Sequence, residues 1–260
     1  MNIGYLGFGA MGSAMAEGFA KFAPAIQRGE ITQYAYAPHA DKLQKRASEI
    51  GVLPCASAEE LAAKCDMIVL ACKPYQAEQV LRAPDLRGKA LVSLANTWTH
   101  DRLKAVLGDG VRVQYIMPNI PMKIGKGTVL LAAENDLTAE ERQTLRALLE
   151  SVSAVIELPE DKIPAANALT GCGPAFLYMV IEALGDAGVK HGLGRRAAYE
   201  LAAAAMVGAG EMVLRDPDAH PGALKDAVCS PAGITIRGVA ALEESGMRGD
   251  FIRAVDAVLA

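Results

Sequence analysis

The chain has 260 residues, of which 52% are hydrophobic, so it has enough apolar material for one large domain or two modest ones. Its formal net charge of −4 gives no reason to expect nucleic acid or an anionic membrane surface as a partner. The five cysteines form neither a CxxC pair nor a metal-binding pattern with the four histidines, so we expect reduced thiols, no metal and a cytoplasmic protein.

The segment GFGAMG at 7–12 follows a short apolar run at 3–6 and precedes a helix-compatible run. In this order Gly7 makes the tight turn, Gly9 lets the backbone approach a pyrophosphate, and Gly12 lets the helix pack on the strand. The N–H groups at the start of such a helix favour an anion. The segment predicts a dinucleotide site, the alternative being a plain βα turn, and its residues are Gly7, Phe8, Gly9, Ala10, Met11 and Gly12.

The end of the next predicted strand, 33–37, indicates which dinucleotide is bound. NAD-binding folds usually place an acidic residue there for the ribose 2′-hydroxyl. Glu30 precedes this strand and so lies at the wrong end, whereas Lys42 and Arg46 follow it. The turn itself has no carboxylate, since it consists of Tyr36, Ala37, Pro38 and His39. We therefore expect NADPH to be preferred, with NADH possible, unless the two bases only solvate a helix face.

Three later strands end in residues that suit a ligand, because open α/β sheets bind ligands outside the carboxyl ends of their strands. Lys73 and Asn119 are placed to reach the ribose or nicotinamide amide of a cofactor, although either can equally be an ordinary loop residue. The three segments are Ala71-Cys72-Lys73-Pro74, Ala95-Asn96-Thr97 and Met117-Pro118-Asn119. The predicted cofactor set therefore adds Ala37, Pro38, Ala71, Lys73, Pro74, Ala95, Asn96, Met117, Pro118 and Asn119.

Strand-like and helix-like segments alternate through the first 160 residues, which is typical of a mostly parallel sheet with helices on both faces. From 165 onward nearly every segment indicates a helix. We therefore predict an α/β fold with a Rossmann-type dinucleotide-binding domain at 1–160 and an all-helical domain at 161–260. The expected strands are 3–6, 33–37, 67–71, 90–94, 111–117, 128–133 and 154–158, and the expected helices include 40–50, 58–64, 139–151, 175–188, 195–214 and 235–244.

The helical half contains a stretch at 200–210 that is apolar nearly all round, and such a helix must be buried. A domain of about 100 residues is small for hiding it alone. The stretch is therefore either the centre of a compact bundle or, as we favour, an interface with a second subunit. The N-terminus lacks a basic signal-peptide segment, and Glu182 and Asp186 interrupt the best apolar run, so we expect no membrane span.

Five segments in the same order and spacing resemble the pyrroline-5-carboxylate reductase family over nearly the whole chain. The resemblance implies a Rossmann-type domain, a helical dimerisation domain that interlocks with a second subunit, and homo-oligomers built from dimers. It also implies NAD(P)H-dependent reduction of a small imine acid, 1-pyrroline-5-carboxylate, to L-proline. The segments are GFGAMG, ACKP (71–74), IMPNIP (116–121), LTGCGPAFLYMVIEALGDAGVKHGL (169–193) and HPGALKDAVCSPAGITIRGVAALE (220–243).

The resemblance places the substrate at the loop 228–235, with Thr235 as the contacting threonine and Ser230 as a second donor. N–H groups at the start of the predicted helix 235–244 suit the substrate's carboxylate. The predicted catalytic set is Thr235, Ser230, Val228 and Gly233. The alternative is that Ser230 or Thr235 only caps the helix. Asp218 matches a usually acidic position near the substrate, but with Asp216 it also fits an ordinary exposed turn.

Several positions depart from the family's usual pattern and leave the cofactor preference and substrate range open. The family's GSGPAY and SPGGTT are here GCGPAF and SPAGIT, and AAG is Ala95-Asn96-Thr97. The departing residues also include Tyr115 for arginine and Ala58 for asparagine. One alternative is a reductase of a six-membered imine acid, allowed by Phe176, Ala232 and Ile234. Another is a non-catalytic dinucleotide-binding protein, although the intact GFGAMG and the loop at 230–235 argue against it.

Little acid–base help is required for the expected reaction, because a cyclic imine is readily protonated near neutral pH. Catalysis can then rest on positioning the hydride donor against the substrate. The helix GPAFLYMVIEAL has no lysine or asparagine, whereas β-hydroxyacid dehydrogenases carry a lysine acid on the comparable helix. This difference argues against a ketone or alcohol substrate.

Overall fold

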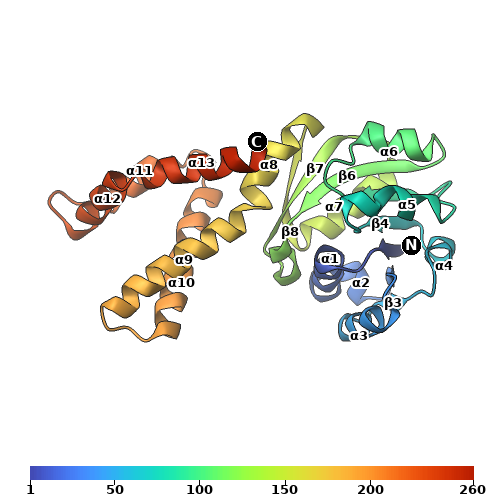
Figure 1. Ribbon diagram of the computed structural model, residues 1–260, viewed down its shortest axis with the longest axis horizontal. Coiled ribbons are helices and arrows are strands. Elements are labelled where there is room, and N and C mark those ends of the chain that lie inside the picture. Colours follow the sequence, from blue (N-terminus) through green and yellow to red (C-terminus); the bar gives the residue numbers. More distant parts are fainter. The chain divides into compact units, whose positions relative to one another are not determined.

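The computed structural model describes every residue, Met1–Ala260, and the chain divides into two compact units, Met1–Gly171 and Cys172–Ala260. The first unit is built on one eight-stranded sheet in the order β3-β2-β1-β4-β5-β6-β7-β8 (Figure 1). All neighbouring strands are parallel except β6 and β7. The strands are β1 (Asn2–Leu6), β2 (Thr32–Tyr36), β3 (Leu53–Pro54), β4 (Met67–Leu70), β5 (Ala90–Ser93), β6 (Arg112–Pro118), β7 (Gly127–Asn135) and β8 (Ser153–Leu158).

The helices of the first unit cover both faces of this sheet, which confirms the predicted Rossmann-type α/β fold. Ser57, Thr99 and Thr138 each accept a hydrogen bond from a backbone N–H three residues later, so three of the helices begin where a side chain caps them. The helices are α1 (Ala10–Phe22), α2 (Pro24–Gln27), α3 (Ala40–Ile50), α4 (Ala58–Lys64), α5 (Ala77–Arg82), α6 (His100–Leu107), α7 (Ala139–Glu150) and α8 (Ile163–Thr170). Three short 3-10 segments are η1 (Pro74–Gln76), η2 (Ile120–Ile124) and η3 (Glu160–Lys162).

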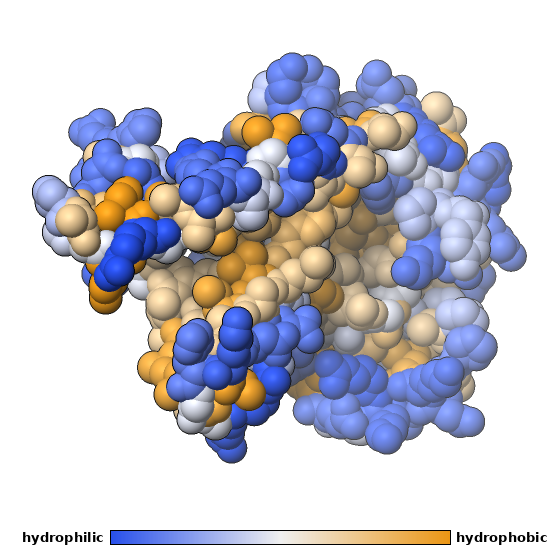
Figure 2. Space-filling model, turned by 60° about the vertical axis from the view of Figure 1, so that its left-hand side comes forward, coloured by the Kyte–Doolittle hydropathy of each residue, from blue (hydrophilic) through white to orange (hydrophobic).

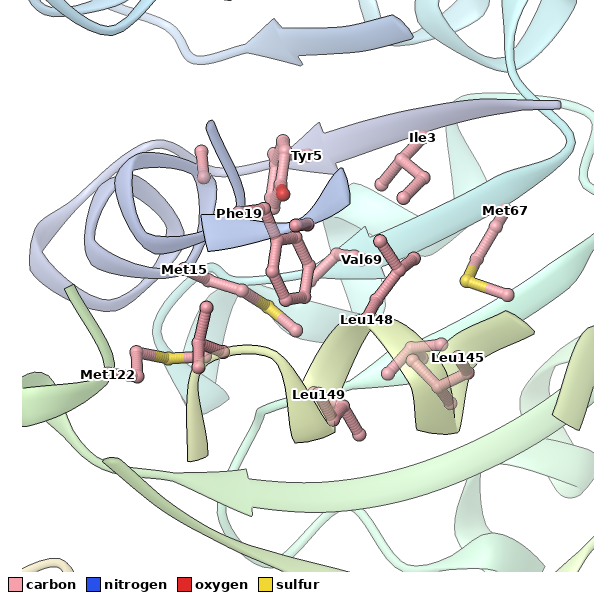
Figure 3. Close-up of a cluster of buried hydrophobic side chains, with 14 of the residues drawn as sticks. Ile3, Tyr5, Met15, Phe19, Met67, Val69, Met122, Leu145, Leu148 and Leu149 are labelled. Atoms are coloured by element: carbon pink, nitrogen blue, oxygen red, sulfur yellow. The ribbon is translucent and has the colours of Figure 1, made fainter. Parts of the chain in front are cut away.

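A large apolar cluster lies between one face of the sheet and the helices α1 and α7 (Figure 3). The labelled side chains of this cluster come from β1, α1, β4, η2 and α7. They are Ile3, Tyr5, Met15, Phe19, Met67, Val69, Met122, Leu145, Leu148 and Leu149. A second cluster, which includes Leu61, Leu81 and Leu103 from α4, α5 and α6, covers the opposite face. The first unit therefore buries the apolar sides of its helices against its own sheet.

The last helix of the first unit, α8, packs against β6 and β7, with Ile163 buried beside Tyr115 and Leu130. The compact unit ends at Gly171, because α8 belongs to the sheet's packing rather than to the helices that follow, and the domain boundary at 160 stays a prediction.

The second unit is entirely helical, as predicted. Its first two helices pack closely, because glycines on α9 face side chains of α10: a Cβ on Gly188 would lie 2.9 Å from that of Ala198, and Gly185 leaves room for Tyr199. Pro174 occupies the first turn of α9, a position where its missing N–H costs nothing. The helices are α9 (Gly173–Lys190), α10 (Arg195–Arg215), α11 (Pro221–Ala227), α12 (Ile234–Glu244) and α13 (Met247–Leu259).

Much of the apolar surface of the second unit is exposed within one chain, and orange and tan atoms extend along it in Figure 2. Leu201 and Val207 on α10 are 60% and 66% exposed. The stretch 200–210 is therefore not the centre of a compact bundle within the chain, which removes the first of the two explanations for its apolar sequence.

Two helical segments, Glu160–Lys190 and Arg195–Arg215, are long and apolar enough to cross a membrane by length and composition. Core helices of soluble proteins meet the same test, so the expected absence of a membrane span stays a prediction. Glu182 and Asp186 lie near the C-terminal end of the first segment, and the residues before them are apolar enough to meet the criterion.

Candidate cofactor and substrate sites

The residues of the predicted cofactor set lie together at one edge of the sheet, where the parallel strands β1, β2, β4, β5 and β6 all end. Backbone hydrogen bonds continue past the strands and fix these ends: Gly7 N donates to Tyr36 O over 2.9 Å, and Ala71 N donates to Leu6 O over 2.8 Å. The strand order reverses between β1 and β4. Ligands of open α/β sheets bind at such a reversal, which places the site at the end of β1.

The three positions of the turn after β1 require glycine for different structural reasons. Gly7 has φ +97°, and a Cβ there would lie 2.7 Å from Cys72 N. A Cβ on Gly12 would lie 2.6 Å from Gly7 O and 3.0 Å from the Cβ of Ala71. Packing therefore requires glycine at both positions, as predicted.

Gly9 is different, because a Cβ there would meet no protein atom within 4 Å. Gly9 is the N-cap of α1, no side chain caps this helix, and its first turn carries no acidic residue. Protein packing gives no reason for glycine at this position. Close approach of a ligand's phosphates to the backbone does give one, and the free N–H groups of α1 suit such an anion. The residues present therefore fit a dinucleotide.

The end of β2 carries no acidic side chain, but the structure changes the roles of the bases that follow. Arg46 binds Glu17 at 2.9 Å and Glu49 at 3.1 Å, so its guanidinium is not free for a 2′-phosphate as the sequence suggested. Lys42, in the first turn of α3, forms no salt bridge. Asp41 precedes it in the chain, and the sequence analysis missed this acid although it lies only five residues after Tyr36, the end of β2.

The segments after β4 and β5 are tied to each other. Trp98 is buried, and its Nε1 donates to Pro74 O over 2.9 Å. The Arg102 guanidinium lies 4.2 Å from the centre of the Trp98 ring and also donates to Thr97 O over 3.3 Å. Lys73 and Asn96 are exposed at this edge, so both side chains are accessible to a ligand.

Thr97 has φ +68°, a left-handed conformation that is unfavourable for a β-branched residue. Its N–H is held by Asn96 Oδ1 at 3.0 Å, and its carbonyl is held by Arg102. The strain therefore persists because the surrounding contacts fix the loop. Thr97 is also the position at which the resembling family carries glycine.

Two residues near this edge, Cys72 and Tyr115, have raised pKa values and stay uncharged at neutral pH. Burial raises the pKa of the Cys72 thiol to about 11, so it stays protonated at neutral pH and is not a nucleophile. Burial, with a smaller contribution from Glu160, raises the pKa of Tyr115 to about 12. Tyr115 thus replaces the family's arginine with a neutral side chain inside an apolar cluster.

The end of β6 places Met117 half-buried and both Pro118 and Asn119 buried. The Asn119 amide bridges two backbone groups: Nδ2 donates to Thr170 O over 2.9 Å, and Oδ1 accepts from Thr128 N over 2.8 Å. Asn119 therefore has a structural partner on each side of its amide, and its contact with a cofactor stays a prediction.

The loop of the predicted catalytic set joins α11 to α12, and Gly233 is the N-cap of α12. No side chain caps this helix, so neither Ser230 nor Thr235 is the helix cap that formed the alternative interpretation. Thr235 is exposed in the first turn, Val228 is 65% exposed, and the first N–H groups of α12 have no partner within the helix. These donors are free for an anion.

Ala232, within this loop, has φ +58° and is the chain's other non-glycine residue in the left-handed region. It also stands where the family carries glycine. Asp218, the weaker substrate candidate, forms an exposed turn in which its N–H donates to Asp216 Oδ1 over 3.0 Å. This geometry is that of the ordinary turn considered as the alternative.

Comparison with known proteins shows similarity across the whole chain. The family described as pyrroline-5-carboxylate reductase dimerisation matches residues 160–260, and the family described as NADP oxidoreductase, coenzyme F420-dependent, matches residues 2–97. The pyrroline-5-carboxylate reductase of Treponema pallidum (strain Nichols) is 41% identical over 264 residues, with 100% of this chain and 99% of the relative covered. That of Escherichia coli (strain K12) is 34% identical, with 98% and 94% covered.

Solved structures give the same result. The crystal structure of Plasmodium falciparum pyrroline carboxylate reductase with NADP bound has a TM-score of 0.86 at 32% identity, and 99% of this chain and 96% of that chain are covered. The 1-pyrroline-5-carboxylate reductase of Streptococcus pyogenes has a TM-score of 0.88 at 26% identity, with the same coverage of 99% and 96%. The similarity thus includes both the sheet and the helical unit.

Proposed function

The chain belongs to the pyrroline-5-carboxylate reductase family, and on this premise we propose that it reduces 1-pyrroline-5-carboxylate to L-proline with NADPH. The observation that carries the proposal is the 41% identity, over the whole chain, to a relative of that name. The reaction adds a hydride to the carbon of the ring C=N bond and leaves the ring nitrogen protonated. It is an oxidoreductase reaction and the last step of proline biosynthesis.

The sheet edge supports the cofactor part of the proposal. Gly9 and the N–H groups of α1 would hold the pyrophosphate, because nothing in the protein competes for that space. When bound, NADPH supplies the hydride that reduces the C=N bond. The other proposed cofactor contacts are Ala37, Pro38, Ala71, Lys73, Pro74, Ala95, Asn96, Met117 and Pro118, since the strand ends bring them to the same edge.

A preference for NADPH over NADH is supported by the end of β2, which has no acid to bind a 2′-hydroxyl. Lys42 is the base available to a 2′-phosphate, because Arg46 is occupied by two carboxylates. Asp41 opposes Lys42 from the same turn of α3, so we expect the preference for NADPH to be modest.

The first turn of α12 is the proposed carboxylate site, with Ser230, Thr235 and the free N–H groups of that turn as donors and with Gly233 and Val228 beside them. A carboxylate taken from water needs several hydrogen-bond donors, and the uncapped helix start offers them without a mobile cation. Because the imine is protonated near neutral pH, the chain's task is to hold and orient it.

The helical unit carries a dimerisation domain, and we propose that a second copy of the chain covers its exposed apolar helices. Assemblies built from such homodimers, a cytoplasmic location, and the absence of membrane and nucleic-acid partners complete the proposal. The five free cysteines fit a reducing compartment.

Purified full-length protein tests the function directly through NADPH oxidation with five- and six-membered imine acids supplied in parallel. We expect the five-membered acid to be preferred by about 10- to 200-fold in kcat/KM, the usual worth of one methylene in a fitted pocket. Preference for the six-membered acid would instead support the alternative that Phe176, Ala232 and Ile234 suggest. NADPH binding without oxidation of either acid would contradict a reductase function.

A further inference from the structure

The Asn119 amide links three elements that are distant in the sequence. Asn119 follows the end of β6 and is only 7% exposed. Its Oδ1 accepts from Thr128 N, at the start of β7, and its Nδ2 donates to Thr170 O, at the end of α8. Both ends of the amide are therefore committed, at 2.8 and 2.9 Å, to backbone groups of the first unit.

The bond to α8 falls at a significant place in the chain. Thr170 is the last residue of α8, and the carbonyls in the last turn of a helix have no partner within it. Gly171, which follows, is the last residue of the first unit, and Cys172 begins the second. The Asn119 side chain thus holds the point at which the chain leaves the first unit.

The other side of the bridge is the cofactor edge. Met117 and Pro118, which immediately precede Asn119, belong to the proposed cofactor set, and Pro118 pairs with Val129 of β7. A single buried amide therefore fixes the distance between the end of β6 and the exit of the chain toward the unit that carries the proposed substrate loop.

We propose that Asn119 is a positioning residue for the reduction, acting through the end of α8 and not through contact with the cofactor. This inference rests on the proposed function, since the reduction uses both the cofactor edge, which Asn119 adjoins, and the unit that follows the end of α8. Loss of the bond from Nδ2 to Thr170 O lets the end of α8 move, and hydride transfer is sensitive to displacements of about 1 Å.

Three variants separate the two halves of the bridge from each other and from general destabilisation. Asn119→Ala removes both bonds. Asn119→Asp keeps an acceptor for Thr128 N but, when ionised, has no donor for Thr170 O. Gln114→Ala is the matched control, because Gln114 is a buried amide on β6, the strand that Asn119 follows. Its Nε2 donates to Tyr115 O at 3.0 Å and to Ala132 O at 2.8 Å, and not to α8.

Stopped-flow or steady-state kinetics, NADPH titration and melting curves should be measured on all three variants. We expect kcat to fall by about 10- to 100-fold in Asn119→Ala, with the Kd for NADPH unchanged. Gln114→Ala should lower Tm but keep kcat. An equal loss of kcat in both alanine variants would reduce Asn119 to a purely structural role, and a weakened Kd for NADPH would make it a cofactor contact; either overturns the proposal.

The Asn119→Asp variant adds a readout that general destabilisation would not produce. A protonated carboxyl can donate to Thr170 O while its other oxygen accepts from Thr128 N, so it reproduces the bridge. Relative to the wild type, kcat of this variant should therefore recover as the pH falls through the pKa of the new carboxyl. A pH profile parallel to that of the wild type contradicts the proposal.

Hydrogen exchange keeps this test independent of the proposed activity. In Asn119→Ala, the amides of residues 168–172 should exchange faster than in the wild type, whereas Gln114→Ala should leave them unchanged. If the wild type reduces no imine acid, the proposed function fails while this measurement still decides whether Asn119 fixes the exit. Unchanged exchange at the end of α8 overturns the inference even in an active enzyme.

Discussion

The two units of the chain treat their apolar side chains in opposite ways. Met15 and Phe19 on α1 are 0% and 1% exposed, because the sheet covers them. Leu201 and Val207 on α10 are 60% and 66% exposed in one chain. The first unit covers its helices with its own sheet, whereas the second unit leaves apolar side chains exposed within one chain and matches a dimerisation family. We therefore expect the stability of the second unit, but not of the first, to depend on protein concentration.

The largest expected effect comes from placing a charge on each exposed apolar surface. Leu201→Glu should break the proposed dimer, because an uncompensated buried charge costs about 3–5 kcal/mol. Leu53→Glu, at a 48% exposed position of β3 in the first unit, is the matched control and should leave the assembly unchanged. Light scattering measures both. A wild-type protein that is monomeric at micromolar concentration would refute the comparison itself.

The next effect concerns the substrate loop of the second unit. Thr235→Ala should lower kcat/KM for the imine acid by about 10- to 150-fold, since a hydrogen bond to a charged group contributes about 1.5–3 kcal/mol. Thr235→Val keeps the branched shape and should lower it equally, and NADPH affinity should not change. Tm should also stay near that of the wild type, because Thr235 does not cap α12. Normal kinetics in both variants would move the carboxylate site elsewhere.

Each unit has one strained residue, so glycine should stabilise both. Thr97→Gly and Ala232→Gly should each raise the free energy of unfolding by about 1 kcal/mol, because the left-handed region is unfavourable for residues with a Cβ. Ala240→Gly, inside α12, is the control and should cost about 1 kcal/mol. Melting curves at several protein concentrations should show a concentration-independent shift for Thr97→Gly. Lower stability of Ala232→Gly would mean that the loop's conformation is not strained.

The smallest effect concerns cofactor preference within the first unit. Lys42→Ala should reduce the ratio of kcat/KM for NADPH to that for NADH by up to about fivefold, as expected for an exposed ion pair worth at most about 1 kcal/mol. Asp41→Asn should raise the ratio by a similar factor. Lys45→Ala makes the same charge change one turn further along α3 and should have little effect. Equal ratios in all the variants would leave the choice of cofactor to other residues.

Local patterns in the sequence predicted most of the first unit. All seven strands expected from apolar runs are present, and α3 and α4 have the predicted ends. The strand β3 was missed because its two residues are too few to form a pattern. Gly7 and Gly12 have the packing reasons that the sequence predicts for them, whereas the contact of Gly9 with a pyrophosphate stays a prediction.

The errors involve partners that are distant in the sequence. Arg46 looked free because its carboxylate partner Glu17 lies on α1, 29 residues earlier. The partner that the sequence did not reveal for Asn119 is Thr170, 51 residues later, and the contact of Asn119 with a cofactor stays a prediction. A signal did exist for the two strained positions, since both are sites where the family pattern has glycine and this chain does not.

Because β7 runs antiparallel to β6, the length of α8 determines where the end of this helix lies relative to Asn119. Because β7 and β8 run opposite to β6, the chain leaves β8 near Glu134, whose carboxylate accepts from Glu160 N, and α8 must carry it back to Asn119. At 1.5 Å and about 100° per residue, its eight residues span about 12 Å. Inserting or deleting one residue in α8 would turn Thr170 by about 100° around the helix axis and move its carbonyl away from Asn119 Nδ2.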